Sequence, residues 1–444
     1  MCVVSSFSIL LSSFAPLMTS PTFENLAVIA SGWVLSSSKR TVTGIIQRAG
    51  AVGTKDHSVF HRFFSRARWS IDEVSHVLLG LLLRFVPAGE IVYLAVDDTL
   101  CRKRGLHVFG ACMHHDPLIS CRKFRLVNWG HNWVVVGIIL RFPFAPKAYW
   151  CLPFAFRLYI SRKRPKSQRW KRGKRVHKTR PQLAVEILEK VAIWFPERSF
   201  HLLGDSAYGG ESVANKRPEN FELTSRIVLN AKLYDDPKPH KGKGRPRKKG
   251  RVLPSPQAVA KDRKKKWKTV KFNLYGKKRT LQIKTHSGRW KSVGFRRINI
   301  TIVRDPSGVT PDQAFYTTDL TTKAVDTLSR YAARWSIETA FQNAKSHFGF
   351  EDPQNRTKLA VERTAPMGMV FYSLVVVWFA NVGHKQCKFP NRPWYYWKST
   401  ASFLDMIVTI QRESWREHFL QDPALKRGAR KLIRLFDESL RPTG

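Results

Sequence analysis

Residues 91–99, Ile-Val-Tyr-Leu-Ala-Val-Asp-Asp-Thr, form a continuous apolar run that ends in two carboxylates. Such a run is typical of a strand that is buried on both faces, as in a sheet covered by helices. Residues 133–140 and 199–204 form two similar runs, and the second of these ends at Asp205. We therefore predict an α/β fold in which Asp98 and Asp205 follow buried strands, where α/β sheets carry their sites.

The composition predicts a folded protein that binds a polyanion. The 444 residues include 77 Lys and Arg against 32 Asp and Glu, which gives a formal net charge of +45, and 12% are aromatic. A disordered polycation lacks such aromatic content, so the chain has a core, and its length predicts two or three domains. The excess positive charge repels itself unless a polyanion neutralises it, and nucleic acid is the commonest such partner. A small-molecule substrate is therefore not expected.

The cysteines and the apolar stretches predict an intracellular protein outside the membrane. The six cysteines include no Cys-x-x-Cys pair, which is typical of a reducing compartment. The apolar N-terminal residues 2–18 contain no Lys or Arg and so lack the basic start of a secretion signal. Residues 365–383 are uncharged, but Pro366 and Gly368 interrupt their start, so we expect a buried core helix rather than a membrane span.

Residues 20–86 predict a small helical domain that binds DNA. Its middle helix, residues 56–68, carries Arg62 and Arg66 beside three phenylalanines, so one face can pack while the basic face meets phosphate. An exposed basic helix without a specific role is an equally good interpretation.

Residues 87–385 are predicted to form the core, with residues 206–320 as a basic, β-rich insertion and residues 386–444 as a C-terminal helical region. Lys265 lies in a run of lysines within this insertion, and Arg245 lies in a Gly-Arg-Pro sequence similar to an AT-hook. For these basic segments we favour a solvated loop that contacts phosphates over specific readout of the minor groove.

Residues 322–348 carry the strongest functional pattern. On an α-helix with 3.6 residues per turn, Tyr331, Arg334, Glu338 and Lys345 fall within an arc of roughly 60°. An adjoining stripe of Ala, Ile and Phe side chains would bury the helix against a core. A surface helix with an ordinary Arg334–Glu338 pair would show the same spacing, so the stripe alone does not establish a site.

Asp98 and Asp205 change the interpretation of this helix. Three carboxylates brought together with Glu338 would repel each other without cations, and carboxylate oxygens are the ligands that Mg²⁺ or Mn²⁺ prefers. Two such ions can activate water on one side of a phosphodiester and stabilise the leaving oxygen on the other.

With these residues the chain resembles the DDE transposases of bacterial insertion sequences. It matches the branch with a Tyr-Arg-Glu-Lys signature, here Tyr331, Arg334, Glu338 and Lys345, and a β-rich insertion before the catalytic Glu. The resemblance covers roughly residues 20–385. It implies an RNase H-like mixed sheet, preceded by a helical domain, that nicks double-stranded DNA at the element's ends and joins the 3′-hydroxyl to target DNA.

The resemblance also implies roles for single residues. Asp98, Asp205 and Glu338 would be catalytic and would bind two Mg²⁺ or Mn²⁺ ions, while Tyr331, Arg334 and Lys345 would hold phosphates. It implies a dimer in the synaptic complex and a location in the bacterial cytoplasm with the nucleoid.

Several alternatives remain open at the level of sequence. Asp97 competes with Asp98 as the first ligand, because neighbouring side chains on a strand face opposite ways; the order Asp-Thr in the family selects Asp98. Trp267 or Trp290 could stack on a base, although packing is the simpler role for Trp290. Four side chains suggest zinc but lack a second pair at zinc-finger spacing, so we expect no zinc there: Cys112, His114, His115 and Cys121.

Alternative functions are a transposase-derived protein that only binds DNA, a related metal-dependent nuclease, and a non-enzymatic architectural protein.

Overall fold

The computed structural model describes the chain except for residues 1, 117–118, 122, 163–176, 240–245, 275–276, 390–397, 422–427, 429–430 and 436–444. The predicted contact Arg245 therefore lies outside the described residues. The helices are α1 (Ser5–Ser12), α2 (Ser20–Leu35), α3 (Val42–Arg48), α4 (His57–Ser65), α5 (Ile71–Leu83), α6 (Arg180–Trp194), α7 (Glu211–Ala214), α8 (Pro256–Lys261), α9 (Ala324–Ala333), α10 (Ser336–His347), α11 (Lys358–Asn381) and α12 (Phe403–Gln421).

The strands form one mixed sheet. They are β1 (Val92–Arg102), β2 (Cys112–His115), β3 (Val127–Phe142), β4 (Ala145–Tyr159), β5 (Phe200–Gly204), β6 (Phe221–Ile227), β7 (Leu233–Tyr234), β8 (Val252–Leu253), β9 (Lys268–Leu274), β10 (Lys277–Trp290), β11 (Arg296–Arg304) and β12 (Gln313–Thr317). Their order is β2-β3-β1-β5-β6-β12-β11-β10-β7-β8, with β4 on β3 and β9 on β10. Only the β1–β5 and β5–β6 pairs are parallel among the described strands. The predicted α/β fold with an RNase H-like mixed sheet is confirmed.

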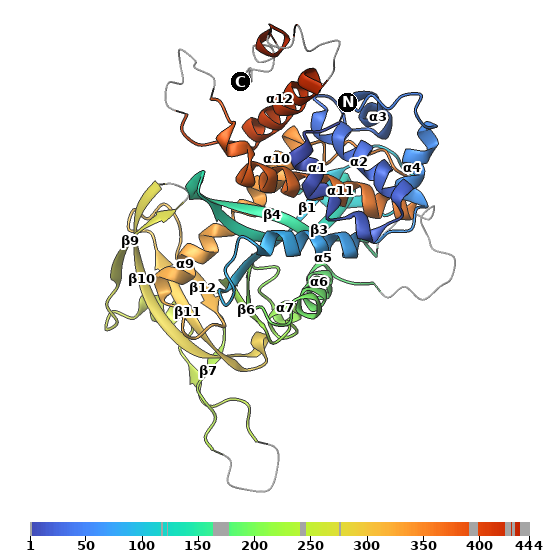
Figure 1. Ribbon diagram of the computed structural model, residues 1–444. Helices are drawn as coiled ribbons and strands as arrows, with labels where there is room; N and C mark the ends of the chain where they lie inside the picture. Colours follow the sequence, from blue (N-terminus) through green and yellow to red (C-terminus); the bar gives the residue numbers. More distant parts are fainter. Residues whose placement is uncertain are drawn as a thin grey trace.

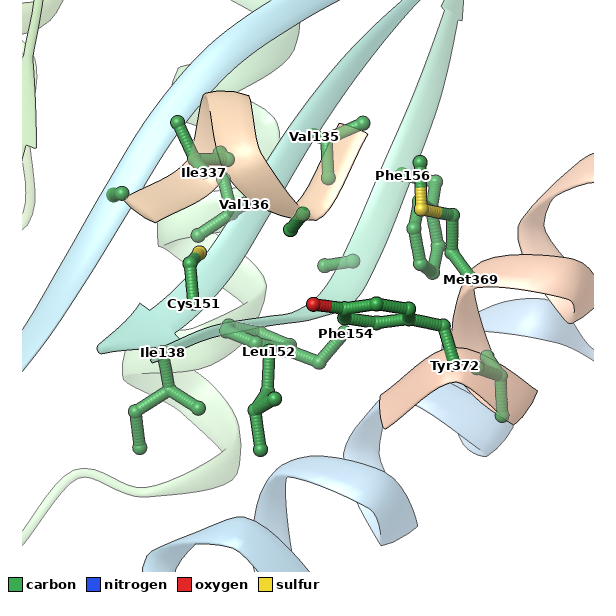
Figure 2. Close-up of a cluster of buried hydrophobic side chains, with 14 of the residues drawn as sticks. Val135, Val136, Ile138, Cys151, Leu152, Phe154, Phe156, Ile337, Met369 and Tyr372 are labelled. Atoms are coloured by element: carbon green, nitrogen blue, oxygen red, sulfur yellow. The ribbon is translucent and has the colours of Figure 1, made fainter. Parts of the chain in front are cut away.

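Long antiparallel pairs surround the parallel centre of the sheet. β3 pairs with β1 and with β4, so the predicted strand 133–140 is the middle of a longer strand, buried almost throughout. α10 and α11 pack on β4. Figure 2 shows how Ile337 of α10 and Met369 and Tyr372 of α11 meet the apolar side chains of β3 and β4. The packing of α10 on this part of the sheet positions the functional helix.

The helical N-terminal region shares its core with the rest of the molecule. α1, α2, α4 and α5 pack on α11, and α12 packs on both α2 and α11 (Figure 1). One hydrophobic cluster runs from Phe7 through the sheet to Ile410. The proposed boundary at residue 86 is therefore not marked by a separate core, and the division into domains stays a prediction.

The region predicted as a β-rich insertion contains strands β6–β12, as expected, but β6 also pairs in parallel with β5. The strands of this region therefore extend the central sheet from β6 to β8, and the yellow strands β9–β11 of Figure 1 belong to this extension.

The apolar stretch 365–383 lies largely within α11, which is long and apolar enough to span a membrane by composition. Its side chains from Thr364 to Phe379 are buried inside the protein, so the predicted core helix is confirmed. Pro366 lies inside this helix.

The predicted single helix 322–348 is divided in two. α9 ends at Ala333 and α10 begins at Ser336. At the joint the backbone bonds have i to i−3 spacing: Arg334 N donates to Tyr331 O and Glu338 N donates to Trp335 O. Tyr331 and Glu338 therefore belong to different helices, with Arg334 between them.

Candidate active site

The parallel pair β1–β5 places two carboxylates side by side. Val96 is in register with Gly204, so the next residues, Asp97 and Asp205, lie beside each other and their side chains leave the sheet on the same face. Asp205 Oδ1 accepts hydrogen bonds from the backbone N–H groups of Ala207 at 2.9 Å and Tyr208 at 3.3 Å. This turn holds the Asp205 carboxylate at the end of β5.

Arg334 connects this face to α10. Its Nη1 lies 2.9 Å from Asp97 Oδ2, and its Nη2 lies 2.7 Å from Glu338 Oε1. The Arg334 residue is only 7% exposed, and its buried Nε has no hydrogen-bond partner among the described residues. A single guanidinium therefore bridges the carboxylate of a strand and the carboxylate of a helix.

Burial and neighbouring charge shift the titration of this cluster. Burial raises the pKa of Asp97 to about 7, and the adjacent Asp205 carboxylate adds to the shift while Arg334 opposes it. Burial opposes the charge of Arg334, but Asp97, Tyr331 and Glu338 together raise its pKa above the usual value. The carboxylates thus need a cation nearby, and in this structure Arg334 supplies it.

Asp98 lies on the opposite face of β1, in a second polar cluster. Its Oδ2 accepts hydrogen bonds from Asn132 Nδ2 at 2.8 Å and from Arg180 Nη1 at 2.6 Å, and its Oδ1 accepts one from Tyr208 Oη at 3.1 Å. The Arg180 guanidinium also lies over the ring of Tyr159. Asp98 therefore anchors the start of α6 to the central strand.

The two faces of β1 bear on which aspartate is the first metal ligand, which the sequence predicted to be Asp98. Of the two neighbouring aspartates, it is Asp97, not the predicted Asp98, that shares a face with Asp205 and Glu338, because side chains alternate along β1. Asn132 and Arg180, which bind Asp98, carry no sequence signal that marks them as site residues. Tyr208 was visible in the Gly-Asp-Ser-Ala-Tyr segment after β5 without an assigned role.

The other members of the predicted stripe face the sheet. Tyr331 packs on Phe315 with ring centroids 4.6 Å apart, and its burial raises the pKa of the phenol. Lys345 Nζ donates to Leu100 O at 2.7 Å, and burial lowers the pKa of this lysine. Both residues therefore support the packing of α9 and α10 on the sheet in the absence of DNA.

The predicted DNA contacts in other regions lie on exposed surface. Arg62 and Arg66 are exposed on or next to α4, whose three phenylalanines are buried, as the two-faced helix predicted. Lys265 is exposed and donates to the backbone oxygen of Thr285. The exposure of these side chains does not show that they bind DNA, so their role in DNA binding stays a prediction.

The remaining candidates have structural partners. Trp267 lies between two cations, 4.6 Å from Lys284 Nζ and 4.3 Å from the Arg304 guanidinium, and Trp290 packs on Tyr316. Cys112 Sγ lies 3.3 Å from His114 Nε2.

No group of three or more His, Cys, Asp and Glu side chains in the described part of the chain is arranged to hold a metal ion. Asp205 and Glu338 therefore do not form a preassembled metal site with either Asp97 or Asp98. For Glu338 the reason is visible: Arg334 lies between it and Asp97.

The donor chemistry of the Arg334 face still suits a hard cation. Asp97, Asp205 and Glu338 offer carboxylate oxygens, the ligands that bind Mg²⁺ and Mn²⁺ together with substrate phosphate. The guanidinium that now neutralises two of them is itself a good partner for phosphate.

Comparison with known proteins gives one result. Residues 13–293 match the family described as DDE superfamily endonuclease, which covers more than half of the chain and includes β1 and β5 with their aspartates. No curated protein matches the sequence. The family is defined by an endonuclease domain that acts on DNA, in agreement with the mixed sheet, the carboxylates at its central strands and the charge of +45. The chain therefore belongs to the DDE superfamily of endonucleases.

Proposed function

We propose that this protein is a metal-dependent transposase that cleaves the ends of an insertion sequence and joins them to target DNA. The observation that carries the proposal is the Arg334 guanidinium that bridges Asp97 and Glu338, with the Asp205 carboxylate close to Asp97, in an endonuclease fold. The family supports DNA cleavage; the transfer step rests on the Tyr-Arg-Glu-Lys signature in the sequence.

We assign the metal ligands to Asp97, Asp205 and Glu338, and we place Asp98 in a positioning role. The bound Mg²⁺ or Mn²⁺, in one or two ions, would polarise the phosphodiester and supply the attacking water. Asp98 already has three hydrogen-bond donors, including the Arg180 guanidinium, so its charge is neutralised without a metal.

Arg334 would exchange one anion for another during the reaction. Without a metal it neutralises Asp97 and Glu338. If Asp97 and Glu338 held a cation, the guanidinium would be available to a DNA phosphate. Its planar fork suits bidentate contact with phosphate as well as with carboxylate. Lys345 and Tyr331 would hold this segment in place and present charge near the same strand.

The excess charge of the chain supports the choice of substrate. Phosphate contacts supply most of the affinity of proteins for DNA, and the basic residues around the sheet can neutralise a duplex over a long track. Binding of both element ends would bring two protein subunits together in the bacterial nucleoid.

A strand-nicking assay tests the proposal and the choice of ligand together. The substrate is a labelled duplex that contains the inverted repeat flanking the gene, with and without Mg²⁺. Asp97→Asn, Asp205→Asn and Glu338→Gln should each lower nicking by about 10³ or more, because a metal ion contributes several kcal/mol to such barriers. DNA binding, measured by gel shift, should persist in all three variants.

The matched comparison is Asp98→Asn, with Asp312→Asn as a control carboxylate that pairs with Arg304 away from the site. We expect Asp98→Asn to retain part of the activity and Asp312→Asn to retain all of it. Loss of nicking in Asp98→Asn together with full activity in Asp97→Asn would assign the ligand to Asp98. Full nicking by Glu338→Gln would refute the active site as a whole.

A second candidate function, DNA binding without cleavage, is favoured by one observation. The Arg334 bridge neutralises Asp97 and Glu338 without a metal, as a carboxylate cluster that had lost its catalytic role would require. The same assay separates the two: such a protein would bind the duplex but would not nick it with any divalent cation.

A further inference from the structure

The hairpin formed by β2 and the start of β3 carries an unusual share of exposed apolar side chains. Six of the large hydrophobic side chains that are at least one-third exposed in the described chain fall within residues 106–127, namely Leu106, Met113, Ile119, Phe124, Leu126 and Val127. Scattered exposed apolar residues are normal, but a local group of them marks a binding surface.

The register of the hairpin places several of these side chains together. Met113 pairs with Trp129, and His115 pairs with Val127, so Met113, Val127 and Trp129 project from the same face of the ribbon. Leu106 follows Gly105, whose carbonyl accepts a hydrogen bond from Trp129 Nε1 at 3.0 Å. Phe124, in the connection between β2 and β3, is 69% exposed.

The end of the hairpin is held by its own hydrogen bonds. Cys121 N donates to Phe124 O at 3.0 Å. Ser120 Oγ donates to Asp116 O at 2.6 Å and accepts from Leu126 N at 3.0 Å. Asp116, which is 2% exposed, binds both Arg102 and Asn128 at the base. These hydrogen bonds hold the described residues on both sides of Phe124, whose ring is exposed to solvent.

The charge around Phe124 selects the kind of partner. Lys123 and Arg125 flank it and are exposed, and Arg104 lies on the neighbouring connection. None of these three cations has an ion pair with a described residue, whereas the one acidic side chain of the hairpin, Asp116, is buried and paired. An apolar tip between uncompensated cations suits a polyanion with an apolar interior, which is the chemistry of stacked base pairs inside a phosphate backbone.

The hairpin belongs to the same sheet as the carboxylates. β3, which begins at Val127, pairs with β1, the strand that carries Asp97 and Asp98. The separation along β3 between Val127 and Val135, the partner of Asp97, is eight residues, or about 27 Å at about 3.4 Å per residue.

We propose that Phe124, held between Lys123 and Arg125, is a wedge that inserts between base pairs of the bound duplex, away from the cleaved bond. This inference rests on the proposed function, because it requires DNA at the carboxylate site. Apolar wedges of this kind partly unstack one base step and kink the duplex. The kink would fix the register of the DNA and direct the scissile phosphate toward the sheet.

Fluorescence of 2-aminopurine tests the wedge, because this base becomes bright when it is unstacked. A series of end duplexes carries the probe at one position each, from three to ten base pairs from the nick, and each is mixed with full-length protein in Ca²⁺ to prevent cleavage. We expect a several-fold rise in fluorescence at one position or at two adjacent ones. Phe124→Ala should abolish the rise, and Phe124→Trp should restore most of it.

Controls separate the wedge from general binding and from folding. Ile193→Ala removes an equally exposed apolar side chain, on α6, and should leave the signal unchanged. Replacing Lys123 and Arg125 with Gln should reduce the salt dependence of binding by a slope of about two, since each phosphate contact contributes about 0.9. Unchanged melting of each variant shows that it is folded.

Three outcomes overturn the inference. The wedge is excluded if no probe position brightens with the wild-type protein, or if Phe124→Ala keeps the signal. It is also excluded if Phe124→Ala leaves the fluorescence unchanged and instead abolishes self-association in sedimentation, which would assign the hairpin to a subunit contact. Nicking by the wild-type protein without any probe response would reject the wedge alone, whereas absence of nicking would reject the proposed function.

Discussion

Removal of the Arg334 guanidinium should destabilise the metal-free protein in a manner that depends on pH and that Mg²⁺ reverses. Arg334→Met keeps an unbranched apolar stem while it deletes the guanidinium and its charge. The two ion pairs, at 2.9 Å to Asp97 and 2.7 Å to Glu338, are lost together. Removing one partner of a buried ion pair destabilises a protein by about 3–5 kcal/mol. We expect the free energy of unfolding to fall by about 3 kcal/mol, because the Glu338 side chain is one-third exposed.

The pH dependence follows from the titration of Asp97. Its pKa in the folded protein is about 7 with Arg334 present, well above the value of 3.8 for an ordinary aspartate, and loss of the guanidinium raises it further. A folded-state pKa above the unfolded value means that stability falls as the pH rises through the folded-state pKa. The variant should therefore be close to the wild-type protein at pH 6, where Asp97 can be protonated, and clearly less stable at pH 8.

The assay is urea unfolding at pH 6 and pH 8, with and without Mg²⁺. Without metal, the difference between Arg334→Met and wild type should grow with pH, by at most about 1.4 kcal/mol per unit. With Mg²⁺ at pH 8, the variant should regain stability more than the wild-type protein does, because the ion replaces the missing charge.

Arg330→Met is the matched control, since Arg330 pairs with Asp319 in the same segment, away from the cluster. An Arg334→Met variant with the same stability at both pH values as wild type, or one that ignores Mg²⁺, would refute the role of the guanidinium as a substitute cation.

Two further predictions concern buried polar groups outside the carboxylate cluster. Burial lowers the pKa of His131 and His201 to about 3, so the unfolded chain binds protons that the folded protein does not. The free energy of unfolding should therefore fall as the pH is lowered from about 6.5 to about 3. His201→Gln should reduce the slope of this free energy against pH by up to about 1.4 kcal/mol per pH unit. Lys284 Nζ donates to three backbone carbonyls, two within α8 and one just after it. Lys284→Met should therefore lower the free energy of unfolding by about 2–4 kcal/mol and speed hydrogen exchange in residues 256–262. Lys271→Met is the control and should do neither.

Much of the site could be anticipated from local pattern. The continuous apolar runs before Asp97 and Asp205 predicted two buried strands, and the structure has them as neighbouring parallel strands. The spacing of Arg334 and Glu338 predicted that their side chains meet, and they do, because three to four residues make one helical turn even at the joint between α9 and α10. These features depend only on the periods of strands and helices.

The sequence by itself determined the α/β class, the buried strands and helices, the polyanionic partner and the carboxylates available for a site. These follow from side-chain type and from periods of two and 3.6 residues, which act over short distances along the chain. Only the tertiary structure decided which face of β1 meets α10, and hence that Asp97 pairs with Arg334 while Asp98 binds Arg180. Because side chains alternate along a strand, Asp97 and Asp98 must point to opposite faces of β1. Which of the two faces α10 depends on how that helix packs on the sheet, and its residues lie more than 230 positions away in the chain.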